Sequence, residues 1–298
     1  MIRPHQFYSN HETMRDNVFQ RRDTDNSIAK NTIANRAYQE HCLAVQQLRN
    51  AGVSVHVFED HGQNDTPDSV FPNNWFSTHH DGKLVIYPMR CQNRRREVRQ
   101  DMIDFLLQHY QLNDTIDLRY FQDKEQYLEG TGSIVFDHTQ RIAYASLGPR
   151  TCLAPLNQLC EQIGYQAHCF HSYSKNSISI YHTNVVLSVA TNFALLGTDN
   201  IPDQTERTEL IQQLESSGKT VIHLSDDQIH KFAANALELQ ARDGKVFALS
   251  TTAFQSLNTN QRQQIEKYAN LLPLEVPTIE LAGGSVRCMM AGNHLPVK

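Results

Sequence analysis

Helix-like and strand-like patterns of apolar residues alternate along this chain at a nearly constant interval. Stretches with helical periodicity recur every 54 to 63 residues, beginning near Asn31, Arg94, Thr151, Thr205 and Thr259. A short apolar or β-branched strand pattern follows each of them, at Val53–Phe58, Thr115–Tyr120, Tyr165–Phe170, Thr220–Leu224 and Leu274–Leu281. A nearly fixed period of this length indicates an internal structural repeat.

Four of the helical stretches are preceded by a pattern typical of two adjoining strands. The dipeptides Asp81-Gly82 and Asp243-Gly244 are strong hairpin turns, because these residue types tolerate positive φ. The predicted hairpins are Trp75–Thr78 with Leu84–Tyr87, Ser133–Asp137 with Arg141–Ala145, the region Ile178–Leu196, and Leu237–Ala241 with Lys245–Leu249. In the fifth unit we expect the hairpin at Gly284–Ala291 and the helix at Asn31–Asn50.

A unit divided between the two ends of the chain is what a closed ring requires, since closure removes exposed sheet edges. The sequence therefore predicts a single α/β domain over residues 1–298. It would be a five-unit α/β propeller with pseudo-fivefold symmetry, closed by its N- and C-terminal segments. An open βαβ sheet is the alternative, but its parallel strands would not need hairpins. Glycine-rich phosphate-binding motifs are also absent.

Composition excludes several classes of function. With 27 Lys and Arg against 32 Asp and Glu, the net charge is −5, so we expect no nucleic acid partner. The longest apolar region, Ser177–Gly197, is interrupted by polar residues, so we expect no membrane span. The N-terminus lacks the apolar core of a signal peptide, which favours a cytoplasmic location. Six scattered cysteines without a CxxC pair predict neither a disulfide framework nor a structural zinc site. The sequence leaves the oligomeric state open, a homo-oligomer included.

Residues capable of chemistry recur in the loop before each predicted hairpin. Asp68, Glu129, His182 and Asn235 precede the next helix start by 22 to 26 residues, and Cys288 takes this place in the fifth unit. If the units are related by symmetry, these side chains surround one axis at one end of the ring. Equivalent loops on a rigid scaffold are where catalytic groups usually collect.

The residue types in these loops fit nucleophilic catalysis. A nucleophilic cysteine such as Cys288 needs a cation or base nearby, because the thiol is mostly protonated at neutral pH. His182 can stabilise the thiolate and deliver a proton to a leaving nitrogen, while Glu129 can orient the imidazole. Asp68 can accept hydrogen bonds from a substrate rich in N–H groups. Each residue alone has an ordinary structural explanation, and the matching placement in five units is what favours catalysis.

Three motifs resemble the guanidino-group-modifying superfamily of arginine deiminases, dimethylarginine hydrolases and amidinotransferases, which share a five-unit α/β propeller. They are Leu128-Glu129-Gly130, His182-Thr183-Asn184 and the segment GGSVRCM at Gly283–Met289. The segments DSVFPNNW, LEGTGS and YHTNV are most similar to bacterial citrulline-utilisation hydrolases.

The resemblance implies a role for each matching residue. Cys288 would attack the central carbon of a planar C–N group, with His182 as general acid and then base, and with Glu129 at the reaction centre. Asp68 matches an acidic position of the family, and Arg150 an arginine that grips the substrate α-carboxylate. Arg90 is a weaker candidate for that grip, and we interpret Arg94–Arg96 as a solvated helix start. Neither a metal nor an organic cofactor is implied.

Two departures from the family pattern bear on the substrate. Deiminases typically have aspartates where this chain has Asn74 and Asn184. An amide carries no charge and can both donate and accept, so it suits a neutral ureido group better than a guanidinium. We therefore expect a small, arginine-derived amino acid as substrate, namely citrulline, hydrolysed to ornithine, ammonia and carbon dioxide. The alternatives are an arginine deiminase or dimethylarginine-type hydrolase, an amidinotransferase, and a non-catalytic binding propeller.

Overall fold

Four small three-stranded sheets repeat one topology in the computed structural model, which describes residues 1–15, 17–20 and 30–298. In each, two strands form an antiparallel hairpin, and a third strand returns after one or more helices to pair in parallel with the second. The sheets are β3 (Phe76–Thr78), β4 (Lys83–Ile86) and β5 (Asp114–Asp117); β6 (Val135–Asp137), β7 (Ile142–Ser146) and β8 (Gln166–Phe170); β9 (Leu187–Val189), β10 (Phe193–Gly197) and β11 (Thr220–Leu224); and β12 (Leu237–Ala241), β13 (Gly244–Ser250) and β14 (Asn270–Leu274).

The helices follow the predicted alternation, with some helical stretches divided in two. They are α1 (Lys30–Asn50), α2 (Gln92–Arg95), α3 (Gln100–His109), α4 (Gly130–Ser133), α5 (Leu153–Ile163), α6 (Gln204–Ser216), α7 (Asp226–Ile229), α8 (Thr251–Ser256) and α9 (Thr259–Glu266). The hairpin predictions at both Asp-Gly turns are confirmed: Gly82 has a φ of +84°, and Gly244 begins β13 with a φ of +124°. Both values lie in the region that favours glycine.

The fifth sheet differs from the prediction. It has two parallel strands, β1 (Ile2–Pro4) and β2 (Phe58–Asp60), connected through α1. The prediction of a strand at Val53–Phe58 is wrong. The strand β2 begins only at Phe58, which pairs with Ile2, the first residue of β1.

Two predictions near the C-terminal end are also wrong. The strand expected at Leu274–Leu281 lies earlier, because β14 pairs with β13 only up to the partners Ser250 and Leu274. Beyond it, Ile279–Ala282 forms a 3-10 turn. The hairpin expected at Gly284–Ala291 is a series of turns, in which the N–H of Cys288 donates to the carbonyl of Ser285 at 3.0 Å. Most of its backbone hydrogen bonds are local, and a single long-range one, from the N–H of Arg287 to the carbonyl of Asn235 at 3.3 Å, does not make a strand pair.

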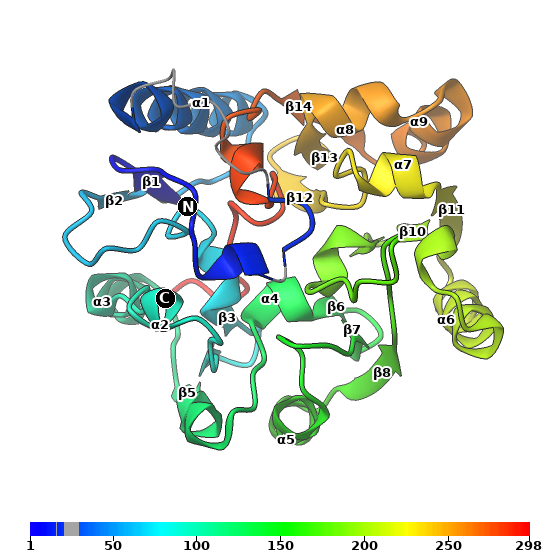
Figure 1. Cartoon of the computed structure of the whole chain (residues 1–298), viewed down its shortest axis with the longest axis horizontal. Coiled ribbons are helices and arrows are strands. Elements are labelled where there is room, and N and C mark those ends of the chain that lie inside the picture. Colours follow the sequence, from blue (N-terminus) through cyan, green and yellow to red (C-terminus); the bar gives the residue numbers. More distant parts are fainter. Residues whose placement is uncertain (16, 21–29) are drawn as a thin grey trace.

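The five sheets lie around the centre of the view in Figure 1, with α1, α3, α5, α6 and α9 toward the outside. This is a mixed α/β arrangement, and the closed fivefold ring remains a prediction. None of the helices in the described part of the chain is long and apolar enough to cross a membrane.

The outer helix α5 packs through an apolar stripe. In α5, the residues Leu156, Leu159, Cys160 and Ile163 are buried, at the spacing of one helical face. They share a core with Ala143 and Ala145 of β7 and with other residues of the neighbouring sheet. Burying a side chain the size of leucine contributes about 1.5–3 kcal/mol, so this stripe fixes the helix against its sheet.

A buried ion pair connects two neighbouring sheets. Lys219, just before β11, lies 2.9 Å from Oδ2 of Asp137 at the end of β6, and both side chains are at most 2% exposed. The Lys219 ammonium also donates to the carbonyl of Thr191 at 3.0 Å. Such a pair tolerates the loss of one partner poorly, because the other charge is then buried alone.

We predict that Lys219→Met destabilises the protein by about 3–5 kcal/mol, because it leaves Asp137 buried without a counter-ion. Urea denaturation followed by circular dichroism measures the change. The control is Lys175→Met: this lysine is 67% exposed, and its buried partner Asp226 keeps a hydrogen bond from Asn200, so stability should change little. The double variant Lys219→Met/Asp137→Asn should recover most of the loss, because it removes the unpaired charge but keeps the side-chain oxygen that accepts from the N–H groups of Thr139 and Gln140. Equal stabilities of the Lys219 and Lys175 variants would contradict this account of the pair.

Candidate active site

The predicted site residues all come from loops and short turns, and nearly all are buried. Glu129 precedes α4, and His182 precedes the 3-10 turn Thr183–Val185, which contains Asn184. Asn235 lies between α7 and β12, and Cys288 lies in the turns after Gly284. Glu129 and Asn235 are 0% exposed and Cys288 is 4% exposed. The structure brings these side chains into two hydrogen-bonded groups.

The first group is built on the carboxylate of Glu129. Its Oε2 lies 2.8 Å from Nε2 of His182 and 3.5 Å from Nη1 of Arg150. Its Oε1 accepts from the backbone N–H of Arg90 at 3.0 Å. An isolated bridge between Leu128 and Thr151 holds the Glu129 and Arg150 segments together. The carboxylate therefore has partners on both oxygens.

These partners govern the pKa values of the group. Burial alone would raise the pKa of Glu129, but Arg150, His182 and Arg94 together hold it well below its usual value. Burial lowers the pKa of His182, although the hydrogen bond and charge of Glu129 oppose that shift. Glu129 is thus a carboxylate at neutral pH, while His182 is a neutral imidazole able to take up a proton.

The second group surrounds the thiol. Nδ2 of Asn235 donates to Sγ of Cys288 at 3.2 Å, and Nδ2 of Asn184 donates to the same sulfur at 3.4 Å. Asn235 also donates to the carbonyl of Asn184 at 3.2 Å. Both donors are uncharged side-chain amides, and together they fix the position of the sulfur. The two groups are adjacent along the chain, because His182 and Asn184 are separated by one residue.

A glycine allows the close packing of this region. A Cβ on Gly132 would lie 2.3 Å from the side-chain amide group of Asn74 and 2.7 Å from Nδ1 of His182. Any larger residue would displace the imidazole, so the Gly-Thr-Gly run in the LEGTGS segment has a packing role.

The interpretation of Arg94 as a solvated residue is wrong. Arg94 is 2% exposed and makes a two-pronged pair with Glu97, with N–O distances of 2.8 and 2.9 Å. The hydrogen-bond pattern orients the Asn74 amide with its oxygen 2.8 Å from Nη1 of Arg94. Nε of Arg94 also lies 3.9 Å from Oδ2 of Asp68. By contrast, Arg96 is exposed, as predicted.

Asp68 lies beside Arg94 rather than beside the thiol. Its Oδ2 accepts from Nδ2 of Asn10 at 2.7 Å, while its Oδ1 is buried without a partner among the described residues. Burial raises the pKa of Asp68, and Arg94 opposes this shift. The unpaired oxygen can accept a hydrogen bond from a bound molecule.

Arg150 and Arg90 are not placed alike. Arg150 is 1% exposed, lies over the ring of Tyr181 at 4.7 Å and donates to the carbonyl of Thr13 at 3.1 Å. Arg90 is exposed and reaches Glu129 through its backbone N–H. The expectation that either one grips a substrate carboxylate stays a prediction.

Sequence reasoning missed four residues that complete the site: Glu97, Asn10, Thr13 and Tyr181. Arg94 and Glu97 are three residues apart in the sequence, which is the spacing of a helical ion pair, so this pair could have been recognised. Tyr181 directly precedes the histidine and donates to the carbonyl of Gly283 at 2.6 Å. Asn10 and Thr13 lie in a segment without periodicity, and no signal marks them.

The site has unpaired acceptors rather than metal ligands. In the described ranges, no three His, Cys, Asp or Glu side chains are grouped to hold a metal ion. Besides Asp68 Oδ1, the amide oxygens of Asn184 and Asn235 are buried without partners among described residues. A thiol with two amide donors, next to these acceptors, suits nucleophilic attack on a molecule rich in N–H groups.

The fold resembles that of several solved enzymes. The N-terminal domain of ArgZ, an arginine dihydrolase from the ornithine–ammonia cycle in cyanobacteria, was solved with substrate; it has a TM-score of 0.73 and 15% identity over 97% of this chain and 95% of that one. AgrE in complex with L-arginine has a TM-score of 0.73 and 15% identity over 97% of this chain, which spans only 39% of AgrE. A dimethylarginine dimethylaminohydrolase adduct with S-methyl-L-thiocitrulline has a TM-score of 0.60 and 14% identity over 86% of this chain and 88% of that one. No curated protein sequence is significantly similar to this one.

At 14–15% identity, the solved structures show only that the fold is shared. The family to which the chain belongs is shown by a family model. The model for eukaryotic N,N dimethylarginine dimethylhydrolase matches residues 3–295. The chain is thus homologous to hydrolytic enzymes that act on guanidino C–N bonds, and the predicted resemblance to the guanidino-modifying superfamily is confirmed. With nearly its whole length matched, the chain belongs to the N,N dimethylarginine dimethylhydrolase family.

Proposed function

We propose that this protein hydrolyses the ureido C–N bond of citrulline through a covalent intermediate on Cys288. The observation that carries this proposal is the pair of amides, Asn184 and Asn235, which donate to Sγ and leave their own oxygens unpaired. A ureido group offers N–H donors to such oxygens and brings no charge that would need a buried carboxylate.

The charges around the site support a neutral substrate. The carboxylate of Glu97 is paired with Arg94, and that of Glu129 with Arg150 and His182. Unlike Glu97 and Glu129, Asp68 keeps one oxygen without a partner among the described residues. Its other oxygen lies 3.9 Å from Nε of Arg94. A cationic guanidinium would enter a region in which two buried arginines outnumber the carboxylate left to receive it.

In the first half of the reaction, Sγ of Cys288 attacks the ureido carbon as the thiol proton passes to the neutral His182 imidazole. The C–N bond to one nitrogen breaks, and that nitrogen leaves with a proton delivered by His182. The carbon stays bonded to sulfur as a thiocarbamate. Glu129 stabilises the protonated imidazole during this transfer.

In the second half, water attacks the thiocarbamate carbon while His182 takes a proton from it. The C–S bond breaks and regenerates the thiolate. The released carbamic acid decomposes to carbon dioxide and an amine. In total, citrulline and water give ornithine, ammonia and carbon dioxide.

The fold contributes to the proposal as well. We propose that the five sheets seen around the centre of Figure 1 form a closed propeller over residues 1–298, with the site at one end. Four sheets of identical topology, each contributing a loop residue to the site, support this arrangement.

We predict that the purified protein releases ornithine and ammonia from citrulline, and that Cys288→Ala abolishes this release. Arginine and dimethylarginine, the substrates suggested by the family and its structural relatives, should react at least tenfold more slowly in kcat/KM. Amino-acid analysis and an ammonia assay measure the products. Citrulline formed from arginine at a comparable rate would contradict the ureido proposal, and so would no turnover of citrulline.

Asn184→Asp should lower kcat/KM for citrulline by about 10²-fold, because a carboxylate beside Sγ disfavours the thiolate and removes one donor. Activity toward arginine, if present, should fall less, since the new charge can pair with a guanidinium. The control is Asn192→Asp, an exposed residue at the turn before β10. Equal losses for both substrates would show that Asn184 plays no part in selecting the neutral group.

The acidic limb of the pH profile should reflect His182. Because the pKa of His182 is lowered below its usual 6.5, kcat/KM should stay high until the pH falls below that value. Glu129→Gln removes the charge that raises the His182 pKa, so the limb should move to still lower pH. The plateau should also fall by about 10²-fold or more, because the imidazole loses its carboxylate partner. An acidic limb that moves to higher pH in this variant would contradict the assigned interaction.

A further inference from the structure

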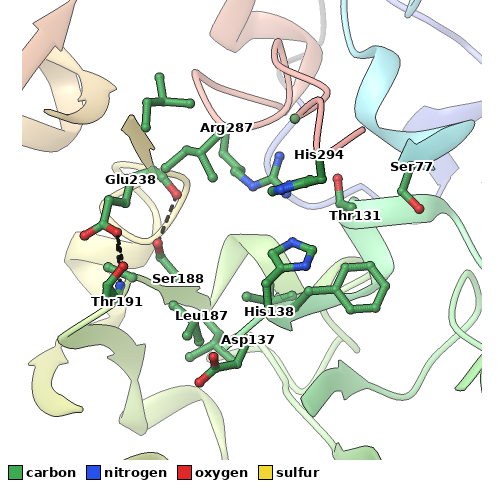
Figure 2. A pocket seen from close by; sticks show the side chains of 18 of the residues that line it. Ser77, Thr131, Asp137, His138, Leu187, Ser188, Thr191, Glu238, Arg287 and His294 are labelled. Atoms are coloured by element: carbon green, nitrogen blue, oxygen red, sulfur yellow. Dashed lines mark hydrogen bonds between the residues drawn. The ribbon is translucent and has the colours of Figure 1, made fainter. Parts of the chain in front are cut away.

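A cavity of ≈250 Å³ opens between the first strands of four sheets, β3, β6, β9 and β12. Figure 2 shows its lining, which includes Arg287 and His294 from the C-terminal segment and His138 just after β6. Cys288, His182 and Glu129 do not line it. The cavity is therefore distinct from the candidate active site, although Arg287 directly precedes the thiol residue in sequence.

Arg287 brings an unneutralised charge to this cavity. Its Nη1 donates to the carbonyl of Met290 at 3.0 Å, and within the described ranges no carboxylate pairs with its guanidinium. Burial lowers the pKa of Arg287 to about 10, which still leaves it charged at neutral pH. Of the described residues that line the cavity, it is the one Arg or Lys. The lining also holds two carboxylates, and each is paired with a lysine outside it, Asp137 with Lys219 and Glu238 with Lys245. A partly buried cation without a counter-ion favours binding of an anion.

Two histidines stand beside this guanidinium. The rings of His138 and His294 lie 4.0 Å apart between centroids, and Figure 2 shows the Arg287 guanidinium next to His294. Burial, together with the neighbouring positive groups, lowers the pKa of both imidazoles. At neutral pH they therefore act as neutral hydrogen-bond donors. The wall beyond them includes the apolar residues Leu187 and Leu239.

We propose that this cavity binds a small oxyanion of carboxylate or phosphate chemistry between Arg287, His138 and His294. The anion accepts hydrogen bonds from the guanidinium fork and from the imidazole N–H groups, and any apolar portion packs on the leucine side chains. Arg287 directly precedes Cys288 in the sequence. An anion bound to the Arg287 guanidinium therefore contacts the same turn that carries the thiol.

The test is a titration followed through the imidazole C–H signals in NMR spectra, assigned with His138→Gln and His294→Gln. Sodium acetate and inorganic phosphate are added separately at constant ionic strength. We expect saturable shifts of the His138 and His294 signals for at least one of the two anions. The tighter of the two identifies the chemical source of the ligand.

Arg287→Gln should weaken the affinity by about tenfold or more, whereas the surface control Arg36→Gln should leave it unchanged. Shifts that do not saturate, or an affinity unaffected by Arg287→Gln, would overturn the proposal. Shifts confined to His182 would place the anion in the active site and overturn it as well. If Arg287→Gln does not fold, His294→Gln decides, since it keeps the cation but removes one donor. An unchanged affinity in that variant also overturns the proposal.

Discussion

The carboxylate of Glu129 is fully buried, so it needs a cation and hydrogen-bond donors, and this need connects the loops of the site. It meets His182 at 2.8 Å, Arg150 at 3.5 Å and the backbone N–H of Arg90 at 3.0 Å. These partners come from three separate loops. A buried carboxylate left without them would be costly, so the loops are held where their charges balance. The orientation of the His182 imidazole, and hence its availability for proton transfer, follows from this balance.

The second determinant of the site is that the side chains donating hydrogen bonds to the thiol are neutral. Cys288 receives its hydrogen bonds from the neutral amides of Asn184 and Asn235, and not from a cationic imidazole. Neutral donors stabilise a thiolate less than a cation does, but they also demand no counter-charge from the substrate. With Glu97 and Glu129 paired to arginines, the region favours a molecule that brings N–H groups without a formal charge. This charge balance is the physical basis for the proposed ureido substrate.

Sequence reasoning located the site better than it located the strand ends. Residue type and recurrence predicted that Asp68, Glu129, His182, Asn235 and Cys288 lie near one another, because loops at equivalent positions of a repeat meet in space. Asn184 was recognised only through the family resemblance. Strand limits depend on the length of the partner strand, which explains the errors at β2 and β14. The burial of Arg94 depends on Glu97, Asn74 and Asp68 together, and the amide orientation of Asn74 has no sequence signal. Asn10 and Thr13 reach the site across more than fifty residues, a separation that periodicity does not encode.

The central claim is that the ureido carbon becomes bonded to Cys288. The most direct measurement is acid quenching of the protein during turnover of citrulline labelled with ¹³C at the ureido carbon, followed by peptide mass spectrometry. The account predicts a labelled thiocarbamate on the peptide containing Cys288, with a mass that shows which nitrogen leaves first. Turnover of citrulline with the label on a different cysteine, or with no covalent label at all, would contradict it.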